Sequence, residues 1–448
     1  MRIGKRNLPL NYLWPLIFCF LISLSLRFWG LGRFGEFVFD EVYFAKYGYN
    51  YLQQVPFFDV HPPLGKYLIS LGIWLHSHIF REEGTAIAYR WLNAFVGSFI
   101  PVIIGAIAYE LTRRPSYAVI SSFLAATDGL LLVESRYSLI NIYLLTFGLL
   151  GQLLFLFGLN FPKKQSFWFF ASGIFFSFCI AVKWNGLGFL LGIYLLYGLV
   201  KGTAKLKFFS PHPLWQQLNK VSPFNFLLNF AIVPSLIYRL LWIPHLSINQ
   251  EFDFWQVHQQ IFGYHNNIGN TTATHPYCSP WYTWPLMLRP VGYYYQEVKN
   301  TLGEVTIYNV HAIGNPFLWW LSTVAILILI GIVLRQLIRY LNKGKINAEH
   351  FCIPIFLIFN YGANFLPWIK VTRCTYIYHY MGASLFAFLA LSWVIERFLY
   401  SRIDSYKYLG AIAIAFIFCA WLFWLPIYFG LPLSQPEFVA RMWLLSWY

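Results

Sequence analysis

Charged residues are scarce in this 448-residue chain. Asp, Glu, Lys and Arg together make up 11% of it, whereas soluble domains carry about 25%. Hydrophobic residues account for 58% and aromatic residues for 21%. Such a chain has too few polar groups to cover its own surface, so we expect lipid to surround it. The composition excludes an ordinary soluble domain and predicts an all-α polytopic membrane protein.

Cysteine is also rare, and nothing in the sequence indicates a metal site. Four of the six cysteines lie inside apolar runs and are expected to pack as small residues: Cys19, Cys179, Cys352 and Cys419. Cys278 and Cys374 fall in predicted outer loops, and whether they pair is left open. No two of the 11 histidines have the H-x-x-x-H spacing of a helical metal site. We predict no cofactor. Acidic residues in the outer loops could bind a divalent cation, so that alternative stays open.

Apolar runs of near-spanning length follow one another along the chain, which we interpret as a single integral-membrane domain over 1–448. The eleven runs cover 9–31, 91–111, 117–133, 138–158, 167–182, 186–200, 225–244, 316–339, 351–368, 377–398 and 408–429. The net charge of +15 raises the alternative of nucleic-acid binding. The basic residues occur in short clusters between the runs, however, and form no stripe on a soluble face, so we interpret them as topological determinants.

The distribution of charge predicts the orientation in the membrane. With eleven spans and a cytosolic N-terminus, more than half of the 32 basic residues but only four of the 17 acidic residues fall inside. Those four are Glu110, Glu349, Glu396 and Asp404. This is the positive-inside pattern. If the fifth and sixth runs were one helix across Lys183, the later basic clusters would lie outside and the pattern would be lost. The first run follows Arg2, Lys5 and Arg6 and is expected to remain as a signal anchor.

Two long outer segments, 32–90 and 245–315, are rich in aromatic residues and proline. Tyrosines recur every four residues from Tyr43 to Tyr51, which predicts an interfacial helix over 42–54. We find no soluble domain and no internal repeat. Functional residues are therefore expected in the outer loops and at the outer ends of the helices.

Phe39-Asp40-Glu41 places two adjacent carboxylates at the membrane surface, just after the first run. Charges at such a position are costly without partners or solvent. Two interpretations are open. In the first, one carboxylate is a general base that accepts a proton from an attacking hydroxyl. In the second, both carboxylates are solvated side chains of a loop.

The segment from Asp59 to Lys66 contains His61 and two prolines that stop one helix before another begins. Lys66 and the free backbone N–H groups of that first turn suit an anion such as phosphate. The alternative is a turn that only starts an interfacial helix, with His61 as a hydrogen-bonded turn residue.

Asp128, Glu134 and Arg136 lie at the outer end of the third run, where charged residues are functional candidates. The Arg136 guanidinium could hold a phosphate in a bidentate fork, or form a local ion pair with Glu134.

Four further candidates lie near the same outer face. Lys183 separates the fifth and sixth runs, and its ammonium could either bind a ligand or extend to the headgroups. Arg373 adds another cation. His379 and Tyr380 begin the run at 377–398, and His379 is either a site residue or a hydrogen-bonded residue at a helix start.

Taken in order, these segments resemble the protein O-mannosyltransferase family. The matching stretches are 38–41, 57–66, 89–94 (with Arg90), 135–136, 182–188, 284–285, 314–316, 366–368 and 378–380. Each stretch is short, but the ordered set extends over nearly the whole chain. The resemblance implies a GT-C type glycosyltransferase fold, with about eleven spans and interfacial helices in the outer loops.

The resemblance also implies an activity and its location. Mannose would move from polyprenyl- or dolichyl-phosphate mannose to Ser/Thr hydroxyls of proteins, on the extracytoplasmic face of a bacterial plasma membrane. Asp40 matches the catalytic residue of the Asp-Glu motif, and Arg136 matches an Arg important in the family.

Two departures from the family pattern are evident. Asn141 stands where the family usually has Asp, and 245–315 is too short for the MIR domain of eukaryotic members.

A single inverting displacement fits both the residues and the resemblance. Asp40, or Glu41 one residue later, would accept the hydroxyl proton, and nearby cations would stabilise the departing lipid phosphate. The cations considered for this role are Arg136, Lys66, Lys183 and Arg373. Three alternatives are open: a related transferase with a lipid or glycan acceptor, a lipid or solute transporter, and an inactive partner-binding subunit. Transporters place ionisable groups near the bilayer midplane, whereas these candidates cluster at the outer face.

Overall fold

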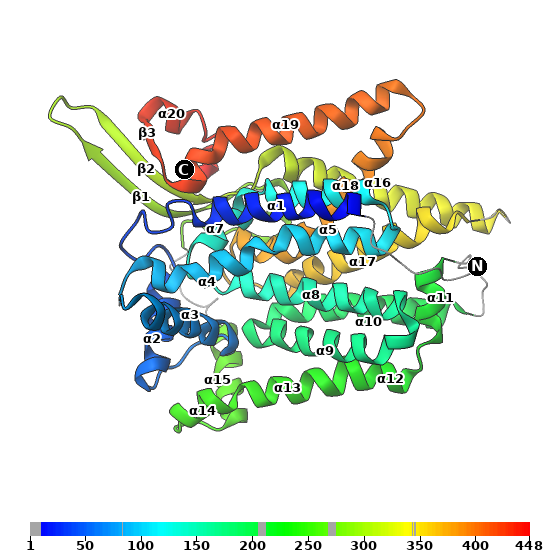
Figure 1. The fold of residues 1–448 in the computed structure, drawn as a ribbon, viewed down its shortest axis with the longest axis horizontal. Helices are drawn as coiled ribbons and strands as arrows, with labels where there is room; N and C mark the ends of the chain where they lie inside the picture. The colour runs from blue at the N-terminus through cyan, green and yellow to red at the C-terminus, as the bar shows by residue number, and fades with distance from the viewer. Residues whose placement is uncertain (1–9, 83, 205–211, 268–274, 343, 345) are drawn as a thin grey trace.

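The structure is a computed structural model that describes residues 10–82, 84–204, 212–267, 275–342, 344 and 346–448. Figure 1 shows an elongated bundle of long helices lying side by side, with shorter helices and a β-hairpin gathered at one end. Several basic residues of the predicted inner clusters lie outside the described residues: Arg2, Lys5, Arg6, Lys205, Lys207, Lys343 and Lys345.

The bundle consists of long apolar helices, as the apolar runs predict. They are α1 (Leu10–Phe28), α4 (Ala86–Ser98), α5 (Ile100–Thr112), α6 (Pro115–Ala126), α7 (Gly129–Arg136), α8 (Asn141–Asn160), α9 (Gln165–Val182), α10 (Leu187–Gly202), α12 (Pro223–Leu227), α13 (Val233–Leu241), α16 (Pro316–Leu341), α17 (Ala348–Phe365), α18 (Met381–Leu399) and α19 (Asp404–Phe429). Within the described residues, nine continuous stretches are long and apolar enough to cross a membrane, and α6 with α7, bent by 60°, makes a tenth. The shorter apolar helix α1 occupies the first predicted run. Every predicted run coincides with a helix, so the helical membrane fold is confirmed.

The fifth and sixth runs are two helices, as the charge pattern predicts. Lys183 ends α9 in an extended conformation, and the 3₁₀ helix η2 (Trp184–Gly186) turns the chain into α10. A Cβ atom at Gly186 would lie 2.7 Å from the carbonyl oxygen of Cys179, so this tight turn needs glycine. The two helices lie side by side in the bundle (Figure 1).

Ion pairs join the helix ends that face away from the β-hairpin, where α17 begins and α18 ends (Figure 1). Arg114, at the start of α6, bonds Glu349 at 2.9 Å and Glu396 at 3.1 Å. Arg397 reaches Glu349 at 2.8 Å. Two of the few acidic residues predicted inside are thus paired with members of the basic clusters.

The opposite end of the bundle carries the long outer segments. The predicted interfacial helix is present as α2 (Glu41–Gln53), and a second helix, α3 (Leu64–Phe80), starts directly after the two prolines. Shorter elements complete this part and the connections: α11 (Pro213–Lys220), α14 (Ile243–Ile248), α15 (Phe254–Asn267) and α20 (Gln435–Val439).

A small antiparallel sheet at this end was not predicted, so the fold is not purely helical. Strands β1 (Val291–Lys299) and β2 (Val305–Ala312) form the projecting hairpin of Figure 1. The short strand β3 (Pro432–Ser434), after α19, pairs with β2. The sheet ties the C-terminal segment to the second outer segment.

The arrangement of the helix ends generates a prediction about topology. A protease-cleavable tag placed after Tyr448 should be cut in intact cells by a protease added outside, because β3 in the C-terminal segment pairs with β2, which lies in the segment predicted to be outside. The same tag before Met1 should be cut only after the membrane is permeabilised, which provides the control. A C-terminal tag that only cytosolic protease reaches would contradict the predicted orientation.

Candidate active site

Asp40 lies at the start of α2, and its carboxylate forms no hydrogen bond or ion pair with any residue that the structure describes. Phe39 before it has a φ of 55°, which is uncommon for a residue with a side chain, and its ring stacks on Tyr293 at 4.1 Å. The Asp40 side chain does not cap α2. Burial raises the pKa of Asp40 to about 6, while Lys183 opposes that rise and Asp59 adds to it. A carboxylate in these surroundings is a candidate general base.

The neighbouring Glu41 has the opposite surroundings, because it is fully buried and both oxygens are bonded. It accepts hydrogen bonds from Arg90 Nε at 2.8 Å and Arg90 Nη2 at 2.6 Å. The backbone N–H groups of Val38 and Ser138 donate to it at 2.8 and 2.7 Å. Arg90 also donates to three carbonyls of the loop before α2. This geometry gives Glu41 and Arg90 a structural role, which is to hold the loop that presents Asp40.

Lys66 lies in the first turn of α3, as predicted, but its ammonium already has partners. It forms a buried salt bridge with Asp59 and donates to the carbonyl of His61 at 2.7 Å. Lys66 therefore forms an internal ion pair, and its phosphate contact stays a prediction. That pair fixes the turn containing His61.

Arg136 also has partners within the protein. Its buried guanidinium donates to four carbonyls near the end of α1, at 2.7 to 3.1 Å: those of Leu26, Arg27, Trp29 and Gly30. A helix end leaves such carbonyls without intrahelical donors, so Arg136 caps α1. It forms no ion pair with Glu134 among the described residues, and its phosphate contact stays a prediction. Asp128 is structural too. It accepts a hydrogen bond from the backbone of α7 at 2.9 Å and one from Trp319 Nε1 at 2.8 Å.

Glu134 belongs to a chain of polar contacts that ends at Lys183. Tyr293 donates to Glu134 Oε1 at 2.5 Å, and Asn141 Nδ2 donates to Oε2 at 3.1 Å. Lys183 Nζ then donates to Asn141 Oδ1 at 2.9 Å and lies 5.5 Å from the Tyr378 ring. Because the amide donates to Glu134 on one side, its oxygen faces Lys183 on the other. Asn141, the departure from the family pattern, therefore orients a site residue.

A cavity of about 670 Å³ opens beside Lys183. Polar side chains from separate elements line it: His61, Lys183, His265, Lys370, Arg373 and His379. Apolar residues line the part between α10 and α17, including Leu187, Leu190, Leu191, Tyr194 and Ala363. The cavity thus combines a cationic region with an apolar groove between membrane helices.

Four predicted site residues meet in this cavity, namely His61, Lys183, Arg373 and His379. Tyr380 is buried and pairs its hydroxyl with that of Tyr361 at 3.2 Å. The sequence did not predict that α15 lines the cavity, which it does with Phe262, His265 and Asn266. No motif surrounds these residues, and only the aromatic composition of the second outer segment drew attention to that region.

The positive charge in the cavity comes from lysine and arginine, while the histidines supply neutral hydrogen-bonding groups. Burial lowers the pKa of His61 well below its usual value, and Lys183 and Lys66 lower it further. Burial also lowers the pKa of Lys183 to about 8, with Asp40 and Glu134 opposing the change. Arg373 keeps its charge, because guanidinium does not deprotonate in proteins.

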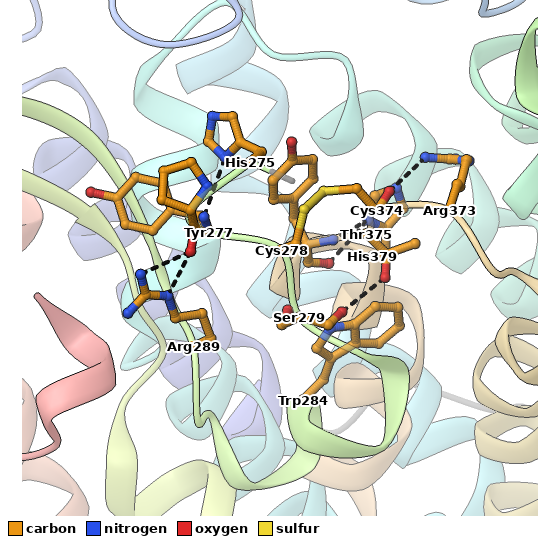
Figure 2. The surroundings of a disulfide bond; sticks show 12 residues. His275, Tyr277, Cys278, Ser279, Trp284, Arg289, Arg373, Cys374, Thr375 and His379 are labelled. Carbon is orange, nitrogen blue, oxygen red and sulfur yellow. Dashed lines mark hydrogen bonds between the residues drawn. A yellow bond between two sulfur atoms is a disulfide. The ribbon is translucent and has the colours of Figure 1, made fainter. Parts of the chain in front are cut away.

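A disulfide joins Cys278 to Cys374, which answers the question that the sequence left open. Figure 2 shows it linking the loop before the 3₁₀ helix η6 (Trp281–Leu286) to the segment that carries Arg373. That segment connects the 3₁₀ helices η7 (Leu366–Lys370) and η8 (Ile377–Tyr380). Among the described residues, no group of three or more His, Cys, Asp or Glu side chains is placed to hold a metal ion.

An apolar groove that leads to Lys183 and Arg373 suits the binding of a lipid-borne anion. The protein O-mannosyltransferase Pmt1-Pmt2 complex of S. cerevisiae, solved with its sugar donor, has a similar fold at 14% sequence identity. Its TM-score is 0.82, with 99% of this chain and 93% of that chain covered. The archaeal oligosaccharyltransferase AglB of Archaeoglobus fulgidus reaches a TM-score of 0.53 over 94% of this chain and 55% of its own. The fold is that of the GT-C class of membrane glycosyltransferases.

Within that class the sequence defines the family. A profile described as dolichyl-phosphate-mannose-protein mannosyltransferase matches residues 17–247, and the C-terminal four TMM region of protein-O-mannosyltransferase matches 251–447. The chain belongs to the protein O-mannosyltransferase family. Polyprenol-phosphate-mannose–protein mannosyltransferases of Mycolicibacterium smegmatis and Corynebacterium glutamicum are 24% and 23% identical to it. The alignments cover 95% and 98% of this chain and 91% and 93% of those relatives.

The contacts of Arg136 predict a loss of stability when it is replaced. Arg136→Ala should lower the thermal unfolding midpoint in detergent, because each carbonyl left without a donor costs about 1–3 kcal/mol. Arg136→Lys should recover part of the loss, since one ammonium can reach some of the same carbonyls. The Michaelis constant for the lipid donor should stay unchanged in the folded fraction. An unchanged midpoint with a raised donor Michaelis constant would restore the phosphate-binding role.

Proposed function

We propose that this protein transfers mannose from polyprenyl-phosphate mannose to a protein hydroxyl at the outer face of the membrane in which it lies. One observation carries the proposal. The Asp40 carboxylate has no hydrogen-bond or ion-pair partner within the described part of the chain, and Lys183 opposes the rise in its pKa. Lys183 also lines the cavity with the apolar groove. Relatives named polyprenol-phosphate-mannose–protein mannosyltransferases, aligned over nearly the whole chain, support the choice of sugar and carrier.

The donor would sit in the cavity according to its chemistry. The isoprenoid chain would follow the apolar groove between α10 and α17 into the bilayer. The phosphate would meet Lys183 and Arg373, with His61 and His379 as further hydrogen-bonding groups. His379 Nδ1 can accept from the backbone N–H of Tyr376 at 3.2 Å, in which case Nε2 carries the proton. The mannose would then lie on the Asp40 side of Lys183.

The reaction would be a single displacement at the anomeric carbon. The acceptor oxygen forms a bond to that carbon while the bond to the phosphate oxygen breaks, and the electron pair leaves with the lipid phosphate. Asp40 takes the proton of the hydroxyl late in the step, when the attacking oxygen has become acidic. Lys183 and Arg373 stabilise the charge that develops on the phosphate. The configuration at the anomeric carbon inverts, and a retained configuration with sugar trapped on Asp40 would contradict the scheme.

The acceptor is proposed to be a Ser or Thr hydroxyl of a polypeptide. A related transferase with a lipid or glycan acceptor remains the second candidate, because it would use the same donor cavity. The transporter alternative is weaker. Asp40 lies in an outer loop and Lys183 at the break between α9 and α10, whereas transport sites lie near the bilayer midplane.

The outer end of the bundle is proposed to face the extracytoplasmic side of a bacterial plasma membrane. The disulfide between Cys278 and Cys374 lies at this end. Such bonds form in oxidising compartments and are rare in the cytosol. The disulfide and the positive-inside pattern therefore support the same orientation.

The transfer reaction can be tested directly with purified enzyme, labelled polyprenyl-phosphate mannose and a Ser/Thr-rich peptide. Wild-type protein should label the peptide. Asp40→Asn should lower the rate about 10²–10⁴-fold, the usual contribution of a general base, because it keeps the shape but removes the proton acceptor. Donor binding and the thermal midpoint should be retained.

Glu41→Gln is the matched control, since it makes the same chemical change one residue away. It leaves the Arg90 charge buried without its partner, at a cost of about 3–5 kcal/mol, so it should lower the thermal midpoint. The remaining folded enzyme should be more active than Asp40→Asn. Full turnover in Asp40→Asn together with loss of turnover in folded Glu41→Gln would move the base by one residue. Label found on lipid instead of peptide would favour the second candidate.

The pKa of Asp40 generates a pH prediction. A general base works only when ionised, and burial raises the pKa of Asp40 to about 6. The rate at low donor concentration should therefore be highest between about pH 6 and pH 8 and fall above pH 8, where Lys183 loses its charge. Below pH 6 it should fall about tenfold per unit as the carboxylate becomes protonated. The residual rate of Asp40→Asn should lack this dependence. A wild-type profile that stays flat down to pH 4.5 would contradict the assignment.

A further inference from the structure

We propose that the disulfide between Cys278 and Cys374 positions Arg373 at the donor cavity, so that opening the bond weakens donor binding. The proposal rests on the proposed function, in which Arg373 contacts the lipid phosphate. Cys278 and Cys374 would be positioning residues, since neither would touch the donor itself.

The position of Arg373 in the chain is the first observation. Arg373 directly precedes Cys374 in the connection 371–376, which lies between η7 and η8 and forms no helix or strand. Val371, Thr372 and Arg373 all line the cavity. The conformation of this short connection therefore determines where the Arg373 guanidinium lies.

The contacts of the guanidinium link it to the bridge. Arg373 Nη1 donates to the carbonyl oxygen of Cys374 at 3.1 Å, as Figure 2 shows. A shift of Cys374 would move both the backbone that carries the Arg373 side chain and the carbonyl that orients it. Lys183 would be unaffected, because its ammonium is held by Asn141 at the α9–α10 break.

The other half of the bridge is firmly anchored. Trp284 is buried and donates from Nε1 to Ser279, at 2.9 Å to Oγ and 3.2 Å to the carbonyl oxygen. Its ring stacks on His379 with centroids 6.0 Å apart. Cys278 therefore ties the Arg373 connection to a rigid wall of the same cavity.

Two hydrogen bonds run parallel to the disulfide (Figure 2). Ser279 N donates to the carbonyl of Thr375, and Thr375 Oγ1 donates to the carbonyl of Ser279, both at 2.8 Å. These contacts would keep the connection near its place after the disulfide opens. The expected effect is thus a partial loss of the Arg373 contact and not the collapse of the site.

Opening the bond is a defined redox step. A dithiol reductant such as dithiothreitol supplies two electrons and two protons, the S–S bond becomes two thiols, and the reductant becomes a cyclic disulfide. Four other cysteines provide controls. Cys19, Cys179, Cys352 and Cys419 are all free thiols in the structure, and Cys419 is exposed on α19.

The test compares oxidised and reduced full-length enzyme in detergent, with thiol labelling to confirm the redox state. Reduction should raise the donor Michaelis constant about three- to tenfold, a fraction of what one charge-assisted contact contributes. The turnover number at saturating donor should fall by no more than the same factor, because Arg373 also stabilises the charge that develops on the phosphate. The Cys278→Ser/Cys374→Ser double variant should show the raised constant without reductant and no further response to it. Cys419→Ser should behave as wild type in both states.

An Arg373→Ala background tests whether the bond acts through Arg373. Arg373→Ala should raise the donor Michaelis constant, and reduction should then add nothing. The same increase on reduction in Arg373→Ala as in wild type would overturn the proposal, and so would a donor Michaelis constant that reduction of the wild type leaves unchanged. Binding of polyprenyl phosphate alone, measured in both redox states, should show the same weakening and does not require catalysis. Absence of mannose transfer by the oxidised wild type would count against the proposed function, whereas equal polyprenyl phosphate affinity in both states would count against the positioning role alone.

Discussion

The buried ion pair between Glu41 and Arg90 is the interaction on which the candidate site depends. Both side chains are fully buried, and removing either partner would leave a charge without compensation in an apolar interior. The pair is retained because both groups are fully hydrogen-bonded: Glu41 also accepts two backbone N–H groups, and Arg90 also binds three carbonyls. These contacts connect α2, α4, the loop before α2 and the turn after α7. They hold the backbone of Asp40 in place while leaving its own carboxylate free. The two adjacent acidic residues thus have different roles: Glu41 holds the loop in place, and Asp40 remains available for chemistry.

The fold could be predicted from the sequence because lipid solvation constrains composition so strongly. Membrane helices must satisfy their backbone groups internally and face lipid, which leaves long apolar runs, and the clusters of basic residues between those runs predict the orientation. The separation of α9 from α10 followed from charge alone. The sheet could not be predicted in the same way. Its strands contain alternating Val, Tyr and Ile, but the same residue types mark an interfacial segment beside a membrane, so the pattern of β1 and β2 did not distinguish the two possibilities.

The site was only partly predictable, for a different physical reason. A sequence shows that a cation lies near the outer face, but it does not show what that cation binds. Lys66 pairs with Asp59 seven residues earlier, and Arg136 binds carbonyls more than 100 residues away in sequence. Lys183 and Arg373, which looked no different in the sequence, line the cavity instead. The α15 residues were missed because their position depends on a long connection folding back over the break between α9 and α10.

The separation of roles among these cations bears on how the proposed reaction would be driven. Before transfer, the lipid phosphate is a diester with one negative charge, and it becomes a monoester that can carry a second. In the same step Asp40 takes up a proton, which removes one negative charge from beside Lys183. The positive charges of Lys183 and Arg373 are therefore less compensated by acidic side chains at the moment when the phosphate becomes more negative. Interactions that strengthen as the transition state is approached accelerate a reaction, whereas those equal in both states only bind the substrate. Had Lys183 been paired directly with an acidic side chain, as Lys66 is with Asp59, that response would be weaker. The neutral amide of Asn141 orients the ammonium without cancelling its charge, which is the arrangement a phosphate leaving group requires.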